Sequence, residues 1–150
     1  MREILFRAKR LDNGEWIYGD LLTPTDIMDV WEISENTGMG DRYEIDPDTV
    51  GQYTGLKDRN GNKIFEGDIV QYQPEYAIEP IHSVVEYCAE KFNYPAFDLK
   101  NHDYEANGLQ CAHEESVVCE VIGNIHDNST LLGDENAQES NSVLRRERGV

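Results

Sequence analysis

The sequence predicts an all-β protein with little helix, folded as a small, strongly bent antiparallel barrel or roll with hairpin extensions. Two observations lead to this fold class. Short segments rich in β-branched and aromatic residues alternate with Gly, Asn, Asp and Pro. Helical periodicity is weak throughout the chain, and the close spacing of the segments suits hairpin connections.

A hairpin opens the chain. Its two strands are expected within 2–10 and 16–22, and Asn13–Gly14 between them supplies the positive φ values of a tight turn. The following stretch, 23–41, combines turn residues with one short apolar piece, Ile27–Ile33.

Two further strands are expected on either side of a proline turn. Arg42–Ile45 is a candidate strand that stops at Asp46–Pro47–Asp48, because proline favours a turn. Thr49–Tyr53 then returns as a strand.

The run TGLKDRNGNKIFEGDIV, residues 54–70, contains the strongest turn signals in the chain. Turn-forming residues fill 57–62, and Ile64–Phe65 returns as a strand. A kink follows before 69–72 continues as β structure. The run therefore predicts a hairpin with a sharp strand entry.

The same phrase occurs earlier in the chain. NGEWIYGDLL at 13–22 and NGNKIFEGDIV at 60–70 share one pattern, in which Glu66 is the only insertion. We interpret both copies as a hairpin followed by a bulged strand. For the second copy we expect positive φ or bulge geometry at Gly61 and Gly67.

The second half alternates strands with polar stretches. Ile81–Cys88 has strong β propensity, and 91–99 is expected to turn and then form a short strand. Residues 100–115 are polar and are either loop or one helical turn. Ser116–Ile125 has the clearest strand pattern, with Gly123 as a bulge.

The length suits one domain, predicted over 1–133, followed by a mobile polar tail, 134–150. No apolar run is long enough to span a membrane, and the interleaved charges of 1–10 do not resemble a signal peptide. Three cysteines without a CxxC pair are typical of a reducing compartment. We therefore expect a cytoplasmic protein without a membrane partner.

Acidic residues dominate the charge. The formal net charge is −17. Acidic residues are concentrated in 11–50 and 74–133, whereas 1–10 has a net positive charge and 51–73 contains equal numbers of acidic and basic residues. Such a balance repels phosphate backbones, so direct nucleic-acid binding is not expected. A solvated surface explains the acid most simply, and patterned carboxylates that imitate nucleic acid are the alternative.

Recognisable enzyme or metal motifs do not emerge from the sequence. Cys111-x-His113, with Cys119 and His126, is the nearest approach to a metal set, but the second close-spaced pair of a structural zinc site is missing. Carboxylates are too abundant for any acid–base pair to be singled out. We predict no catalytic residue, no metal site and no cofactor.

Three blocks, in this order, resemble the YopX family of phage and prophage proteins: MREILFRAKR…WIYGDLL, DPDTVGQYTGLKDRNGNKIFEGDIV and EVIGNIHDN. The resemblance spans roughly 1–132, and the central block is its most specific part. It implies an SH3-like barrel core, which we expect to contain 42–73 and 81–125, and no established activity or catalytic residues. The chain departs from the family after the last block, where Ser129 and Thr130 replace a proline and an acidic residue.

Two groups of motif residues are candidates for a role. The first group is expected to have a structural role in turns, bulges and strand entries: Gly51, Gly55, Asn60, Gly61, Gly67, Asp68 and Gly123. The second group lacks an obvious folding duty and is the candidate contact with a partner: Gln52, Lys57 and Asp58. For these three, a local turn hydrogen bond or a solvated side chain is the alternative.

We interpret the protein as a phage or prophage accessory protein, a non-enzymatic protein-interaction module that acts in the bacterial cytoplasm. Its partner would be a host or phage protein, with a homo-oligomer as a further option, because small β-barrels bind partners along exposed edges or grooves. The first alternative is an acidic mimic of nucleic acid that inhibits a host DNA- or RNA-processing enzyme. An enzyme of unknown type is the least favoured alternative.

Overall fold

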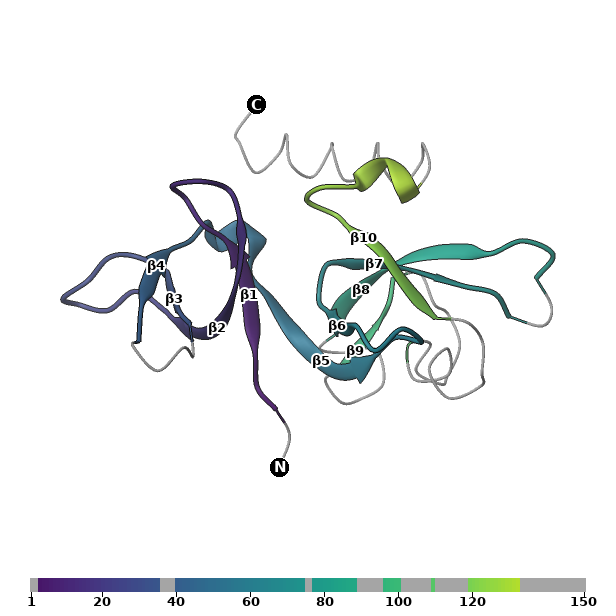
Figure 1. Cartoon of the computed structure of the whole chain (residues 1–150), viewed down its shortest axis with the longest axis horizontal. Helices are drawn as coiled ribbons and strands as arrows, with labels where there is room; N and C mark the ends of the chain where they lie inside the picture. Colours follow the sequence, from purple (N-terminus) through teal and green to yellow (C-terminus); the bar gives the residue numbers. More distant parts are fainter. Residues whose placement is uncertain are drawn as a thin grey trace. The chain divides into compact units, whose positions relative to one another are not determined.

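The computed structural model describes residues 3–35, 40–74, 77–88, 96–100, 109 and 119–132. Among these residues the regular elements are ten β-strands and two short 3-10 helices (Figure 1), so the predicted all-β class is confirmed. The chain divides into two compact units. Unit 1 comprises Met1–Leu56 and Lys63–Phe65, and unit 2 comprises Lys57–Asn62 and Glu66–Val150.

Unit 1 contains a six-stranded sheet in the order β4-β3-β2-β1-β5-β6, which forms an antiparallel half-barrel. Its elements are β1 (Phe6–Lys9), β2 (Trp16–Leu22), β3 (Glu32–Ser34), β4 (Arg42–Glu44), the 3-10 helix η1 (Pro47–Thr49), β5 (Gly51–Lys57) and β6 (Lys63–Phe65).

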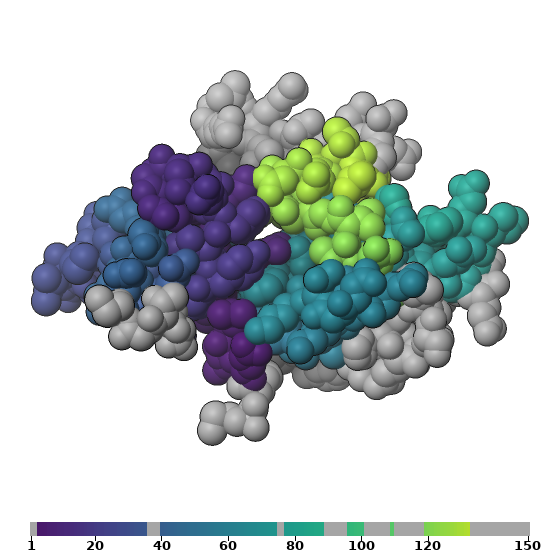
Figure 2. Space-filling model, in the orientation of Figure 1, coloured from purple at the N-terminus to yellow at the C-terminus, as the bar shows by residue number. Residues whose placement is uncertain are grey.

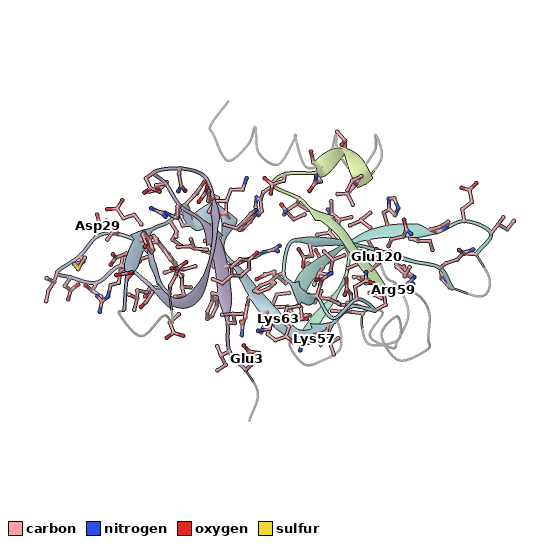
Figure 3. The ribbon with its side chains drawn as sticks, viewed as in Figure 1. Glu3, Asp29, Lys57, Arg59, Lys63 and Glu120 are labelled. Carbon is pink, nitrogen blue, oxygen red and sulfur yellow. The ribbon has the colours of Figure 1, made fainter. Side chains whose placement is uncertain are left out.

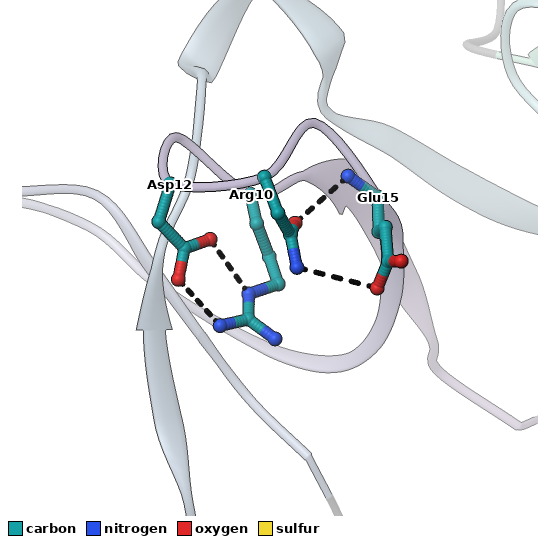
Figure 4. Close-up of polar contacts among 4 residues, drawn as sticks. Arg10, Asp12 and Glu15 are labelled. Carbon is teal, nitrogen blue, oxygen red and sulfur yellow. Dashed lines mark hydrogen bonds and ion pairs between the residues drawn. The ribbon is translucent and has the colours of Figure 1, made fainter.

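The turn between β1 and β2 is the predicted first hairpin turn, and polar side chains fix it (Figure 4). Gly14 has φ of 72°, which glycine adopts without steric cost. The Arg10 guanidinium donates two hydrogen bonds to the Asp12 carboxylate, at 2.9 and 2.5 Å. Asn13 accepts a hydrogen bond from the backbone N–H of Glu15 at 2.9 Å, and its side-chain amide donates to the Glu15 carboxylate.

The sheet of unit 1 curls until the residue after β4 meets the residue after β1. Ile45 forms an antiparallel bridge with Arg10, and the N–H of Asp46 donates to the carbonyl of Lys9 at 2.9 Å. The curl encloses a hydrophobic core. Its buried members are Ala8, Ile17, Ile33 and Ile45, and Phe6, Leu21, Trp31, Tyr43 and Val50 pack against them.

The opposite face of β1 and β2 carries aromatic and cationic side chains. Arg7 and Trp16 each precede a core residue, Ala8 or Ile17, so strand alternation directs them to the other face. The Arg7 guanidinium lies 4.8 Å from the ring centroid of Trp16 and 4.9 Å from that of Phe65. Arg7 is only 6% exposed, so its charge is held between two rings rather than in water.

The two copies of the repeated phrase fold differently. The hairpin predicted for the first copy is the β1–β2 hairpin, but the bulge predicted in its second strand is wrong. Gly19 lies inside β2, which pairs with β1 and β3 in regular register. A Cβ atom at Gly19 would overlap the carbonyl of Ser34, so glycine is needed there for close strand approach. In the second copy the inserted Glu66 forms a turn with Gly67 between β6 and β7.

Unit 2 contains a four-stranded antiparallel sheet in the order β10-β7-β8-β9. Its elements are β7 (Asp68–Tyr72), β8 (Ile81–Cys88), β9 (Ala96–Leu99), β10 (Glu120–Asn124) and the 3-10 helix η2 (Ser129–Leu132). The pairing of β10 with β7 shifts register between Val121 and Gly123. Buried hydrophobic side chains in this unit are Ile69, Val70, Val85, Leu99, Leu109 and Cys119.

The sequence predicted one barrel containing 42–73 and 81–125, but strand pairing places these residues in two different sheets. The strands β4, β5 and β6 join the N-terminal strands in the first sheet, and β7 to β10 form the second sheet. The cause is a long-range pairing, because β5 lies beside β1 with Gln52 opposite Phe6. The predicted tail, 134–150, lies outside the described residues.

Within the described part of the chain, no helix is long and apolar enough to cross a membrane.

Candidate functional site

The loop 57–62, at the centre of the specific sequence block, closes around the side chain of Asp58. One carboxylate oxygen accepts hydrogen bonds from the backbone N–H groups of Asn60 at 2.9 Å and Asn62 at 2.8 Å. The side-chain amide of Asn62 donates to the other oxygen at 3.3 Å. Gly61, with φ of 81°, completes the turn by donating its N–H to the Asp58 carbonyl at 3.0 Å. The carboxylate thus takes the place of a backbone acceptor within the turn.

Two further hydrogen bonds attach this loop to β10. The backbone N–H of Val121 donates to the Asp58 carboxylate at 3.0 Å, and the N–H of Arg59 donates to the carbonyl of Cys119 at 3.1 Å. β10 is the last strand of its sheet and pairs with β7 on one side. The loop therefore satisfies polar backbone groups that an edge strand would otherwise leave open.

Burial and hydrogen bonding act in opposite directions on Asp58. Burial at 7% exposure favours the neutral acid, but the hydrogen bonds from Val121, Asn62 and Asn60 outweigh it, so the pKa of Asp58 lies below its ordinary value. Burial, together with the nearby Asp58 charge, raises the pKa of Cys119 to about 11. Cys119 is therefore a protonated, unreactive thiol at neutral pH.

The loop presents two exposed cations. Lys57 and Arg59, which are labelled in Figure 3, are both exposed, and neither forms an ion pair with another described residue. The Asn60 side chain donates to Glu120 at 3.3 Å on the same unit. Hydrogen bonds to Asp58 therefore hold the loop backbone, while the side chains of Lys57 and Arg59 are exposed to solvent.

The predicted partner-contact residues are divided between the two units. Lys57, the last residue of β5, and Asp58 lie in unit 2, whereas Gln52 is half-buried on β5 in unit 1, opposite Phe6. Of the three, Lys57 is the exposed one. Asp58 makes the local turn hydrogen bonds that were the alternative to a partner contact. It also accepts one hydrogen bond from β10.

The remaining motif residues lie at strand entries, in a turn or within strands. Gly51 is buried opposite Arg7, and Gly55 has φ of 90° on β5. Gly67 has φ of 88°, and its N–H and carbonyl bond to Val85 and Ile125 respectively. Asp68 is 2% exposed at the start of β7. Gly123 lies at the register shift of β10, where the side chain of Asn128 leaves no room for a Cβ atom.

Sequence reasoning missed two polar residues of unit 2. His82 pairs opposite Gln71, with Nε2 2.9 Å from the Gln71 Oε1 atom and Nδ1 2.8 Å from the carbonyl of Leu131. Asp98 is fully buried and accepts hydrogen bonds from the N–H groups of Leu99 and Leu109. The strand pattern places both residues. The bonds of His82 to Gln71 and Leu131 and the bond of Asp98 to Leu109 join residues at least 11 positions apart, so no local signal reveals these contacts.

The Cys and His residues nearest to a metal-site pattern in the sequence do not come together in the described part of the chain. Cys119 is buried, His126 is exposed in the turn after β10, and Cys111 and His113 lie outside the described residues. No group of three His, Cys, Asp or Glu side chains that could hold a metal occurs among the described residues.

By its fold and loop geometry, the chain is a small antiparallel β protein with a hydrogen-bonded surface loop. A family model described as "YopX protein" matches residues 5–133, so the chain belongs to the YopX family. It is also similar to a solved structure, "Crystal structure of protein EF1440 from Enterococcus faecalis", with 27% sequence identity and a TM-score of 0.55. The match covers 88% of this chain and 99% of that one. No curated protein sequence matches this chain.

Proposed function

We propose that this protein is a non-enzymatic protein-interaction module of a phage or prophage, active in the bacterial cytoplasm, and that the loop 57–62 is its contact surface. The supporting observation is the convergence of hydrogen bonds on Asp58. Donors from Asn60, Asn62 and Val121 fix the loop, while Lys57 and Arg59 remain exposed.

A fixed loop is well suited to binding another protein. Because its backbone is already ordered, little conformational entropy is lost when a partner engages it. The direct contact is assigned to Lys57 and Arg59, and Asp58 is the residue that positions them.

Charge defines the partner surface that fits the loop. Lys57 and Arg59 favour carboxylates or carbonyl groups directly opposite them. The chain as a whole carries −17, which opposes approach by a strongly acidic protein. Screening limits that repulsion to about 8 Å at physiological salt, so the partner needs carboxylates at the contact rather than a large acidic field.

Affinity capture from host extract tests this proposal through a matched pair of charge reversals. Arg59→Glu reverses the charge of an exposed loop cation, and Arg42→Glu makes the same change at an exposed position on β4 in unit 1. We expect the partner to be lost with Arg59→Glu and retained with Arg42→Glu. Equal recovery with both variants would contradict the assignment of the contact to the loop. A rise in molar mass of the purified wild-type chain would identify a second copy as the partner.

Mimicry of nucleic acid is the second candidate function. The observation that favours it is a pair of like charges, because Glu32 and Glu44 lie directly opposite each other on β3 and β4. A like-charged pair directly across two strands destabilises the sheet, so its presence favours a functional rather than a structural role for these carboxylates. Under mimicry, DNA- or RNA-processing enzymes would be captured in a salt-sensitive manner. Their recovery would be unchanged with Arg59→Glu and would fall when Glu32→Gln is combined with Glu44→Gln.

A further inference from the structure

The connection between β2 and β3 ends in a tip that one threonine holds in place. The N–H of Thr25 donates to the carbonyl of Met28 at 2.8 Å. In return, the Thr25 hydroxyl oxygen accepts hydrogen bonds from the N–H of Ile27 at 3.3 Å and of Met28 at 3.1 Å. These three bonds fix the backbone at the point where the hairpin turns.

The fixed tip holds apolar side chains in solvent. Ile27 is 93% exposed and Met28 is 46% exposed. Two exposed carboxylates, Asp26 and Asp29, adjoin them, and neither forms an ion pair with another described residue. Figure 3 shows Asp29 on this loop, and Figure 2 shows the loop in slate blue with its atoms uncovered on the visible face.

A single exposed isoleucine is ordinary on protein surfaces and needs no explanation alone. Unit 2 offers such a case: Ile78, in the connection between β7 and β8, is 96% exposed beside Glu79. The tip in unit 1 differs because two adjacent apolar side chains stand between two unpaired carboxylates on a fixed backbone. Prepositioned apolar anchors of this kind carry much of the energy of protein interfaces.

We infer that the β2–β3 tip is a second contact of this module, at which Ile27 and Met28 enter an apolar pocket on a partner protein. The rim of that pocket carries Lys or Arg side chains that pair with Asp26 and Asp29. Charge complementarity commits the inference to a cationic rim, since acidic side chains flank the anchor on both sides. The inference rests on the proposed protein-interaction role but not on the loop 57–62.

Site-specific photocrosslinking of the full chain tests the inference. A diazirine-bearing amino acid replaces Ile27 or, as the matched control, Ile78, and the protein is irradiated in host extract. We expect a discrete adduct from position 27 whose partner peptide maps to an apolar pocket with Lys or Arg at its rim. Asp26→Asn combined with Asp29→Asn is expected to lower the adduct yield about fivefold, and position 78 should give no such adduct.

Several results would overturn the inference. These are no discrete adduct from position 27, an adduct to a second copy of this chain, an acidic partner peptide, or a yield that the two Asp→Asn changes leave unaltered. The experiment also separates this inference from the proposed loop contact. If Arg59→Glu abolishes capture of the partner but position 27 gives no adduct, only the tip inference fails. If position 27 gives the adduct but Arg59→Glu does not reduce capture, only the loop contact fails.

Discussion

The carboxylate of Asp58 accepts a hydrogen bond of 3.0 Å from the backbone N–H of Val121, which lies 63 positions further along the chain. The same carboxylate closes the loop through Asn60 and Asn62. One side chain therefore both shapes the most specific motif of the sequence and fastens it to the last strand of the sheet in unit 2.

Replacing Asp58 by Ala should destabilise the protein by roughly 2–3 kcal/mol, because several buried donors lose their acceptor at once. Urea unfolding monitored by circular dichroism measures this cost. Asp12→Ala is the control, since Asp12 has a 63% exposed side chain in the β1–β2 turn and should cost under about 0.5 kcal/mol. Equal costs for the two variants would show that the carboxylate does not hold the loop.

The contribution of Asp58 to stability should disappear in acid. Its folded-state pKa lies below the ordinary value, so the stabilisation is fully present above about pH 4, the pKa of an unfolded aspartate, and is lost as pH falls through the folded pKa. The free energy of unfolding, measured from pH 6 to pH 3, should therefore converge between the wild-type chain and Asp58→Asn. A difference that stays constant over this range would contradict the depressed pKa.

Gly67→Val should destabilise the protein by more than about 1 kcal/mol, because valine is strained at the φ of 88° found there. Gly67→Asn should cost less, since asparagine tolerates the left-handed region. Thermal unfolding of both variants measures the difference. An unchanged melting temperature for Gly67→Val would rule out the turn geometry between β6 and β7.

Arg7→Ala should cost about 2 kcal/mol or more, because the guanidinium is buried between the rings of Trp16 and Phe65. Arg7→Lys should recover only part of this, since an ammonium group cannot stack between two rings. Urea unfolding gives the two free energies. Full stability of Arg7→Lys would mean that charge, rather than stacking, is what matters at this position.

Local sequence signals predicted much of the fold. Asn13–Gly14 marks the first hairpin, Ile81–Cys88 matches β8 at both ends, and Gly123 lies at the register shift of β10. Each of these signals arises from residues adjacent in sequence, where turn chemistry and β propensity act directly.

Contacts between distant residues could not be predicted in the same way. The pairing of Phe6 with Gln52 brings β5 to the N-terminal strands, and no local pattern indicates it. The burial of Arg7 is equally hidden, because a lone arginine on a strand is ordinarily exposed. For the candidate site, the sequence indicated that 57–62 is a turn, but the attachment of Asp58 to Val121 required the assembled sheet.

The central claim is that a loop made rigid by Asp58 presents Lys57 and Arg59 to a partner protein. Isotope-ratio affinity capture from host extract tests it most directly, with Asp58→Asn, Arg59→Glu and Arg42→Glu each compared with the wild-type chain. We predict that the recovery of one captured protein falls about tenfold with Arg59→Glu and by a smaller factor with Asp58→Asn. Its recovery should be unchanged with Arg42→Glu. If every captured protein is recovered equally with Arg59→Glu and with the wild-type chain, the claim is contradicted.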